Sequence, residues 1–156
     1  MKACFIGLGY IGLPTAIVAA DNGIEVIGVD VNPHVVETIN KGKIHIVEPG
    51  LADLAAKVVS NSWLKAQSEP ESSDVFLIVV PTPFTGDHEP DTSYVEAATR
   101  NVIPFLKEGD LYIIESTSPV GTTENMAELM FSERPDLKDK IYIAYCPERV
   151  LPGNII

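Results

Sequence analysis

The stretch from Cys4 to Pro14, CFIGLGYIGLP, places three glycines within six positions, directly after an apolar run. Gly7, Gly9 and Gly12 match the pattern G-x-G-x-x-G where a strand pattern gives way to a helix pattern. Glycine inside such elements costs about 0.5–1 kcal/mol relative to alanine, so three together indicate a close backbone approach. The pattern predicts a tight turn at Gly7, room for a pyrophosphate at Gly9 and close helix–strand packing at Gly12.

A second apolar run ends in an acid, Asp30, about 20 residues after the glycines. A carboxylate there can accept hydrogen bonds from the ribose hydroxyls of adenosine and would repel a 2′-phosphate. Neither Val31 nor Asn32 supplies a cation for that phosphate. The sequence therefore predicts NAD rather than NADP, with the phosphates held by backbone N–H groups at the helix start. The alternative is a structural turn beside a surface aspartate.

Apolar runs of strand length alternate with stretches of helical period along the chain. This alternation favours right-handed crossovers and a parallel sheet. We expect an α/β, Rossmann-type doubly wound fold with six strands in the order 3-2-1-4-5-6. The expected strands are 3–7, 25–30, 64–67, 75–80, 111–115 and 141–145, and the expected helices are 11–22, 33–41, 51–60, 93–107 and 123–133. Pro104 should kink or end the fourth helix, and Ser93 with Glu96 resembles a capping box.

Composition limits the classes of function. The chain has 156 residues, which suits one domain, and a net charge of −11, which disfavours nucleic acid as a partner. The sequence has no run of 18 apolar residues, so we expect no membrane span, and its N-terminus lacks the pattern of a secretory signal. Cys4 and Cys146 lie far apart, so we expect reduced thiols and a cytoplasmic location.

Three further polar stretches follow predicted strands, at 81–84, 115–124 and 146–150. Ligands of open α/β sheets bind outside the carboxyl ends of the strands, so we expect these loops to join the glycines. Their alternatives are a rigid turn, a helix cap and a surface ion pair. The stretch GDHEPD at 86–91 fits no zinc or calcium spacing, so we expect a solvated acidic loop and no metal.

In order along the chain, GLGYIGLP, GVD, EPGL, PTP, ESTSPVGTTE and PERVLPG resemble the N-terminal domain of the UDP-glucose/GDP-mannose dehydrogenase family. The resemblance covers essentially the whole chain. It implies that the C6 alcohol of a nucleotide sugar is oxidised to a carboxylate, with two NAD and one water consumed. IHIVEPGL, PTPFTGDHEPD and YCPERVLPG most resemble the branch acting on UDP-N-acetyl-D-mannosamine. UDP-glucose comes second, because its enzymes usually have PEFL where this chain has PERV.

The resemblance also implies roles for single residues. Thr117 and Glu148 would position or activate water near the reacting carbon, and Arg149 and Val150 would touch the sugar nucleotide. The cofactor contacts that we expect are Gly7, Gly9, Tyr10, Ile11, Gly12, Asp30, Pro81, Thr82 and Thr123.

The nucleophilic cysteine and assisting lysine of the family belong to later domains. The resemblance therefore implies that 1–156 is one NAD-binding Rossmann domain, without the central helix and C-terminal substrate domains, and that Cys146 is not the nucleophile. We expect the chain to bind NAD without turnover, and the full-length enzyme to take a UDP-sugar and form a homodimer or higher oligomer. Alternatives are a non-catalytic NAD-sensing module, a hydroxy-acid dehydrogenase and a methyltransferase-type domain; the sensing module would have no use for the loops at 115–124 and 146–150.

Overall fold

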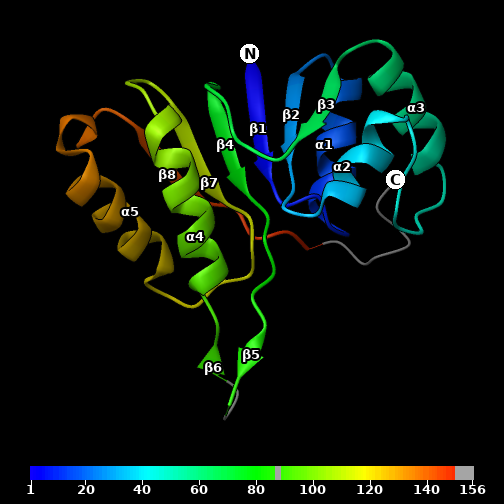
Figure 1. Ribbon diagram of the computed structural model, residues 1–156. Coiled ribbons are helices and arrows are strands. Elements are labelled where there is room, and N and C mark those ends of the chain that lie inside the picture. Colours follow the sequence, from blue (N-terminus) through cyan, green and yellow to red (C-terminus); the bar gives the residue numbers. More distant parts are fainter. Residues whose placement is uncertain (87–88, 150–156) are drawn as a thin grey trace.

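Six parallel strands form the central sheet of the computed structural model, which describes residues 1–86 and 89–149 (Figure 1). The strand order is β3-β2-β1-β4-β7-β8, so the predicted order 3-2-1-4-5-6 is confirmed. The register places Ala3 beside both Val26 and Val75, which makes β1 the centre of the sheet. The strands are β1 (Lys2–Ile6), β2 (Glu25–Val29), β3 (Leu64–Gln67), β4 (Val75–Ile78), β7 (Leu111–Ile114) and β8 (Tyr142–Tyr145).

Helices cover both faces of this sheet, as a doubly wound fold requires. The buried side chains of β1 alternate between two clusters, because successive strand residues point to opposite faces. Ala3 and Phe5 pack with α1 (Gly12–Asp21), α2 (Pro33–Asn40) and α3 (Leu51–Ser60). Cys4 and Ile6 pack with α4 (Ser93–Val102) and α5 (Thr122–Glu133). Within the described residues, no helix is long and apolar enough to cross a membrane.

The segment around α4 departs from the sequence prediction. The helix ends at Val102 and a 3₁₀ turn, Ile103–Phe105, follows; the effect predicted for Pro104 is confirmed, because proline lacks the N–H that a longer helix needs. The capping box is wrong, because Thr92 is the N-cap residue and makes no side-chain cap. Instead, the Asp91 carboxylate accepts the backbone N–H of Ser93 at 2.9 Å. A second 3₁₀ turn, Pro135–Leu137, follows α5.

A small hairpin interrupts the loop after β4. Its strands, β5 (Phe84–Thr85) and β6 (Glu89–Pro90), pair antiparallel and project from the end of the sheet where the strands finish (Figure 1). The sequence predicted only a polar loop here. Asp87 and His88 lie outside the described residues.

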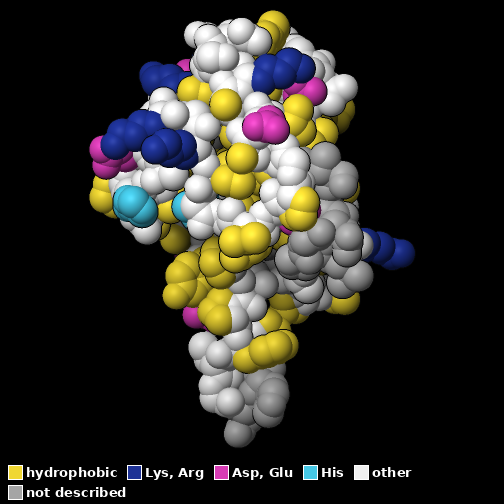
Figure 2. Space-filling model, turned by 90° about the vertical axis from the view of Figure 1, so that its right-hand side faces the viewer, with side chains coloured by type: hydrophobic (Ala, Val, Ile, Leu, Met, Phe, Trp, Pro, Cys, Tyr) yellow, Lys and Arg dark blue, Asp and Glu magenta, His cyan; other side chains and the backbone are white. Residues whose placement is uncertain are grey.

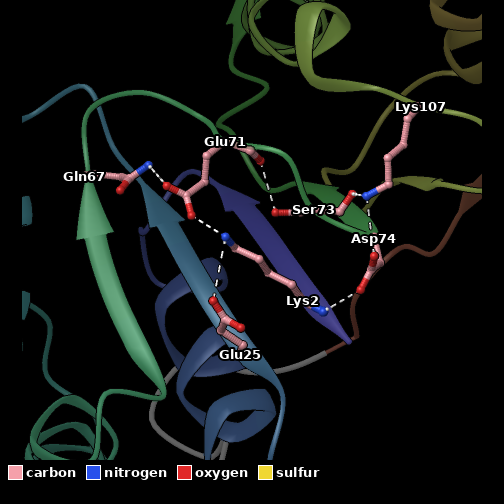
Figure 3. Close-up of polar contacts among 7 residues, drawn as sticks. All are labelled: Lys2, Glu25, Gln67, Glu71, Ser73, Asp74 and Lys107. Carbon is pink, nitrogen blue, oxygen red and sulfur yellow. Dashed lines mark hydrogen bonds and ion pairs between the residues drawn. The ribbon is translucent and has the colours of Figure 1, made fainter.

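Charged side chains are paired at the opposite end of the sheet, where the strands begin (Figure 3). The Lys2 ammonium group contacts the Glu71 carboxylate and lies 3.7 Å from that of Glu25. The backbone N–H of Lys2 donates to Asp74 at 2.8 Å, and the Lys107 ammonium lies 3.6 Å from Asp74. We call these five residues the amino-end network. Its main contact raises the pKa of Lys2 and lowers that of Glu71.

Candidate functional site

A cavity of about 540 Å³ opens at the carboxyl end of the sheet. The loops after β1, β2, β4, β7 and β8 all contribute to its wall, as the sequence predicted for a ligand site of an open sheet. The predicted site residues that line this cavity are Gly7, Gly9, Tyr10, Ile11, Asp30, Pro81, Thr82, Thr117 and Glu148.

The three glycines of the first loop face different surroundings. Gly7 has a φ of +99°, and a Cβ there would lie 2.3 Å from the Val79 carbonyl oxygen. A Cβ at Gly12 would lie 2.0 Å from the carbonyl oxygen of Gly7. These values confirm the tight turn and the close packing. A Cβ at Gly9 would meet nothing within 4 Å, so this glycine keeps open space that a bound group could fill.

The loop also presents backbone donors. Gly7 N–H donates to Val29 O and Leu8 N–H donates to the Asp30 carboxylate, but within residues 1–86 and 89–149 the N–H groups of Gly9, Tyr10 and Ile11 find no acceptor. They precede α1, whose N-terminus has no side-chain cap. Unpaired N–H groups and a positive helix end together favour an anion.

No Lys or Arg is among the described residues that line the cavity. Figure 2 shows the distribution on one face: hydrophobic side chains gather above the projecting hairpin, and most of the Lys and Arg side chains lie further up. A phosphate group in the cavity would therefore depend on backbone N–H groups. A phosphate on the 2′-hydroxyl near Asp30 would meet a carboxylate and no cation.

Asp30 joins the ends of β1 and β2. Its Oδ2 accepts the N–H of Leu8 at 3.1 Å and its Oδ1 accepts the N–H of Asn32 at 2.8 Å. Each carboxylate oxygen has a second lone pair, so both oxygens can still accept hydrogen bonds from ribose hydroxyls. The aspartate therefore holds the glycine loop in place and offers acceptors to a ligand.

Hydroxyl groups tie the loops after β4 and β7 together. Thr82 Oγ1 donates to Thr117 O at 2.7 Å, and Ser116 Oγ accepts the N–H of Val80 at 2.9 Å. The Thr117 hydroxyl itself makes no hydrogen bond within the described part of the chain and is exposed. The loops thus form one wall and leave this hydroxyl available to a ligand.

The other predicted residues are not among the described residues that line the cavity. Gly12 is the first residue of α1 and Thr123 the second residue of α5, and neither lines the cavity; Arg149 is exposed outside it. Val150 lies outside the described residues. The helix-cap alternative for 115–124 is wrong, because α5 begins after Gly121 without a side-chain cap. Ser118 Oγ donates instead to Ser116 O at 2.9 Å.

Sequence reasoning missed Glu115, the residue directly after β7. It lines the cavity although it is only 8% exposed, and its Oε2 has no hydrogen-bond partner among the described residues. Burial raises the pKa of this carboxyl, and the nearby Glu148 carboxylate raises it further, while the Thr15 hydroxyl, which donates to Ile11 O at 2.9 Å, lowers it. An acid at the end of an apolar strand, two residues before Thr117, was the signal that could have identified it.

Within the described residues, no group of three or more His, Cys, Asp or Glu side chains is arranged to hold a metal ion. The described lining of the cavity instead combines free backbone N–H groups, hydroxyls and carboxyls. These groups fit an organic ligand that carries phosphates and sugar hydroxyls.

Known proteins resemble the chain over almost its whole length. UDP-N-acetyl-D-mannosamine dehydrogenase from Campylobacter jejuni is 56% identical over 99% of this chain, and NDP-N-acetyl-D-galactosaminuronic acid dehydrogenase from Ralstonia nicotianae is 54% identical over 97%. The solved UDP-N-acetyl-mannosamine dehydrogenase from Staphylococcus aureus superposes with a TM-score of 0.93, at 42% identity over 98% of this chain.

The chain spans about two fifths of these proteins: 40% of the Campylobacter protein, 38% of the Ralstonia protein and 38% of the Staphylococcus chain. The pattern of the UDP-glucose/GDP-mannose dehydrogenase family, NAD binding domain, matches residues 1–156. The resemblance inferred from the motifs is thereby confirmed: the chain belongs to the UDP-glucose/GDP-mannose dehydrogenase family and is its NAD-binding domain.

Proposed function

We propose that the chain binds NAD across the carboxyl end of the sheet and supplies the cofactor site of an enzyme that oxidises UDP-N-acetyl-D-mannosamine to its uronic acid. The observation that carries the proposal is the single cavity that collects the glycine loop, Asp30, Thr117 and Glu148. The names of the relatives support this substrate. Since those relatives are longer, we propose that this Rossmann domain works with further segments that bind the sugar.

Each part of the cavity has a role in holding NAD. The N–H groups of Gly9, Tyr10 and Ile11 hold the pyrophosphate, and the open space at Gly9 lets it approach the backbone. Asp30 accepts the ribose hydroxyls of adenosine. Pro81 and Thr82 line the side of the cavity beyond β1. The contact of Thr123 with NAD stays a prediction.

The other half of the cavity suits the oxidation. Bound NAD supplies the hydride acceptor. The free Thr117 hydroxyl and the half-buried Glu148 carboxylate position a water molecule or the sugar hydroxyl beside it, and a carboxylate can hold the proton that leaves. Arg149 and Val150 touch the sugar nucleotide; these two contacts stay predictions.

A second substrate is favoured by one comparison. The Ralstonia relative is named for N-acetyl-D-galactosaminuronic acid and is nearly as similar to this chain, so another UDP-linked N-acetylhexosamine is the alternative.

The net charge of −11 opposes nucleic acid as a partner. We place the enzyme in the cytoplasm because a dinucleotide site and two free cysteines suit a reducing compartment. The homodimer or higher oligomer stays a prediction.

Calorimetric titration of the chain with NAD and with NADP tests the cofactor site. NAD should bind and NADP should bind at least tenfold more weakly. Asp30→Asn removes the charge and should weaken NAD about 10- to 100-fold, since a hydrogen bond to a charged group contributes about 1.5–3 kcal/mol. Asp30→Asn should also reduce the difference between the affinities for NAD and NADP.

Asp53→Asn is the matched control, because Asp53 is exposed in the first turn of α3 and does not line the cavity. It should leave both affinities unchanged. A flat titration with NAD up to millimolar concentration, or tighter binding of NADP, would contradict the proposal.

A further inference from the structure

Glu115 is a buried acid to which the proposed function gives no role. Its side chain is more than nine-tenths buried, it lines the cavity, and its Oε2 has no partner among the described residues. Leaving a buried acceptor unpaired costs about 1–3 kcal/mol, more for a charged one. Because Glu115 lines a ligand cavity, its buried carboxylate indicates that a bound ligand supplies the compensating charge.

The order of the strands decides which part of the ligand Glu115 meets. β2 and β7 lie on opposite sides of β1, so Asp30 and Glu115 line opposite ends of the cavity. If Asp30 holds the adenosine ribose and the glycine loop holds the pyrophosphate, the nicotinamide half extends toward β4 and β7. This step rests on the proposed function.

Charge then distinguishes the two redox forms of the cofactor. The nicotinamide ring carries a positive charge when oxidised and none when reduced, whereas the rest of the molecule is the same. Among the described lining residues, the charged side chains are all carboxylates: Asp30, Glu115 and Glu148. We propose that Glu115 is the counter-charge of the oxidised nicotinamide ring and makes the site prefer oxidised to reduced cofactor.

The surroundings of Glu115 make this preference depend on pH. The groups that act on its carboxyl are Glu148, from the loop after β8, and the Thr15 hydroxyl, from α1. Burial and Glu148 raise the pKa of Glu115, so the carboxyl keeps its proton to a higher pH than usual. A positive ring nearby opposes this shift, so binding of oxidised cofactor releases the proton to solvent. The preference should therefore grow as pH rises through the titration of Glu115.

The test measures the dissociation constants of NAD and NADH for this chain between pH 5 and pH 8. In the wild type, the ratio Kd(NADH)/Kd(NAD) should rise with pH. Glu115→Gln should hold the ratio flat and lower it about tenfold or more at pH 8, because at an effective dielectric constant near 20 two unit charges less than about 12 Å apart interact by at least the energy of a tenfold change in affinity. Calorimetry in buffers of different ionisation enthalpy should detect proton release with NAD in the wild type and none in Glu115→Gln.

Two further variants assign the effect. Glu108→Gln removes an exposed carboxylate before β7 and should leave the ratio unchanged. Thr15→Val removes the hydroxyl that lowers the pKa of Glu115, so the midpoint of the pH dependence should move upward. If Glu115→Gln changes both affinities equally, or keeps the pH dependence, the inference is wrong while the cofactor site stands. If the wild type binds neither form, the proposed function fails as well.

Discussion

Polar groups are paired with one another at one end of the central sheet, whereas several lack a partner at the other end. At the end where the strands begin, Lys2 pairs with Glu71 and Glu25, and Asp74 receives both the Lys2 N–H and the Lys107 ammonium (Figure 3). At the end where the strands finish, the cavity collects carboxyls, a free hydroxyl and backbone donors. None of its described lining residues is a Lys or Arg that could neutralise Glu115.

This difference separates groups that stabilise the fold from groups that await a ligand. A buried polar group without a partner costs about 1–3 kcal/mol, so a folded chain pairs such groups wherever it can. Each charged group of the amino-end network has a partner within the network. The carboxyl end retains unpaired groups in one place, and we infer that ligand binding is what compensates for them.

The largest expected effect separates two glycines of the same loop. Gly12→Ala should lower the free energy of unfolding by about 3 kcal/mol, because the new Cβ would collide with the Gly7 carbonyl oxygen at 2.0 Å. Gly9→Ala should change the free energy of unfolding by less than about 1 kcal/mol, since its Cβ meets nothing. Urea denaturation of both variants measures the difference.

The same pair tests whether the open space belongs to the ligand. Gly9→Ala should weaken NAD at least tenfold although the fold is intact, because the methyl group occupies the space that the pyrophosphate needs. The comparison between the two ends breaks down if Gly9→Ala binds NAD normally. It also breaks down if Gly9→Ala unfolds as readily as Gly12→Ala.

The fold could be predicted because its signals are local. Short apolar runs and Pro104 act through residues close to them in sequence, and the glycine pattern is itself a short local motif although Gly7 also lies against Val79; all of them appear in the structure as expected. The hairpin of β5 and β6 was missed, since two strands of two residues around a turn at Gly86 give no alternating pattern. The capping box was wrong because Asp91, one residue before the N-cap, took the Ser93 N–H.

Only the residues of the candidate site that belong to sequence motifs were predicted. Gly7, Asp30 and Thr82 belong to recognisable patterns at strand ends, and the structure brings them to one cavity. Glu115 gives no such pattern, because its pKa is raised by burial in the assembled fold and by the Glu148 carboxylate, which is distant in sequence. A polar residue acquires this kind of environment only when the whole sheet is assembled.

The next expected effect is the response of stability to pH at Glu115. The raised pKa means that the folded state binds a proton more tightly than the unfolded state, so this carboxyl destabilises the fold as pH rises above its ordinary value near 4.5. Glu115→Gln cannot ionise, so it should be about 1 kcal/mol more stable than the wild type at pH 7. This gain should vanish near pH 4, as urea denaturation at both pH values would show.

Glu108→Gln is the control for a surface carboxylate and should show no gain at either pH, since Glu108 is exposed and lies 3.6 Å from the Lys140 ammonium. A gain for Glu115→Gln of equal size at pH 4 and pH 7 would mean that packing, not charge, distinguishes the glutamine. The contrast between the two ends of the sheet would then not be electrostatic.

The smallest expected effect comes from the other end and has the opposite sign. The hydrogen bond with Lys2 lowers the pKa of Glu71, so the stabilisation from Glu71 is present above its ordinary pKa near 4.5 and is lost as pH falls through the lowered value. Glu71→Gln should therefore cost stability at pH 7 and little at pH 3. Because the carboxylate is 37% exposed, solvent screening limits the cost to about 0.5 kcal/mol, and added salt should reduce it.

NAD affinity should not change in Glu71→Gln, because Glu71 does not line the cavity. The pair of variants then gives opposite pH slopes from one sheet: removing a carboxylate stabilises the protein where the group lacks a partner and destabilises it where the group has one. If stability changed with pH in the same direction in Glu71→Gln and Glu115→Gln, the end of the sheet at which a carboxylate lies would not decide whether its charge stabilises the fold.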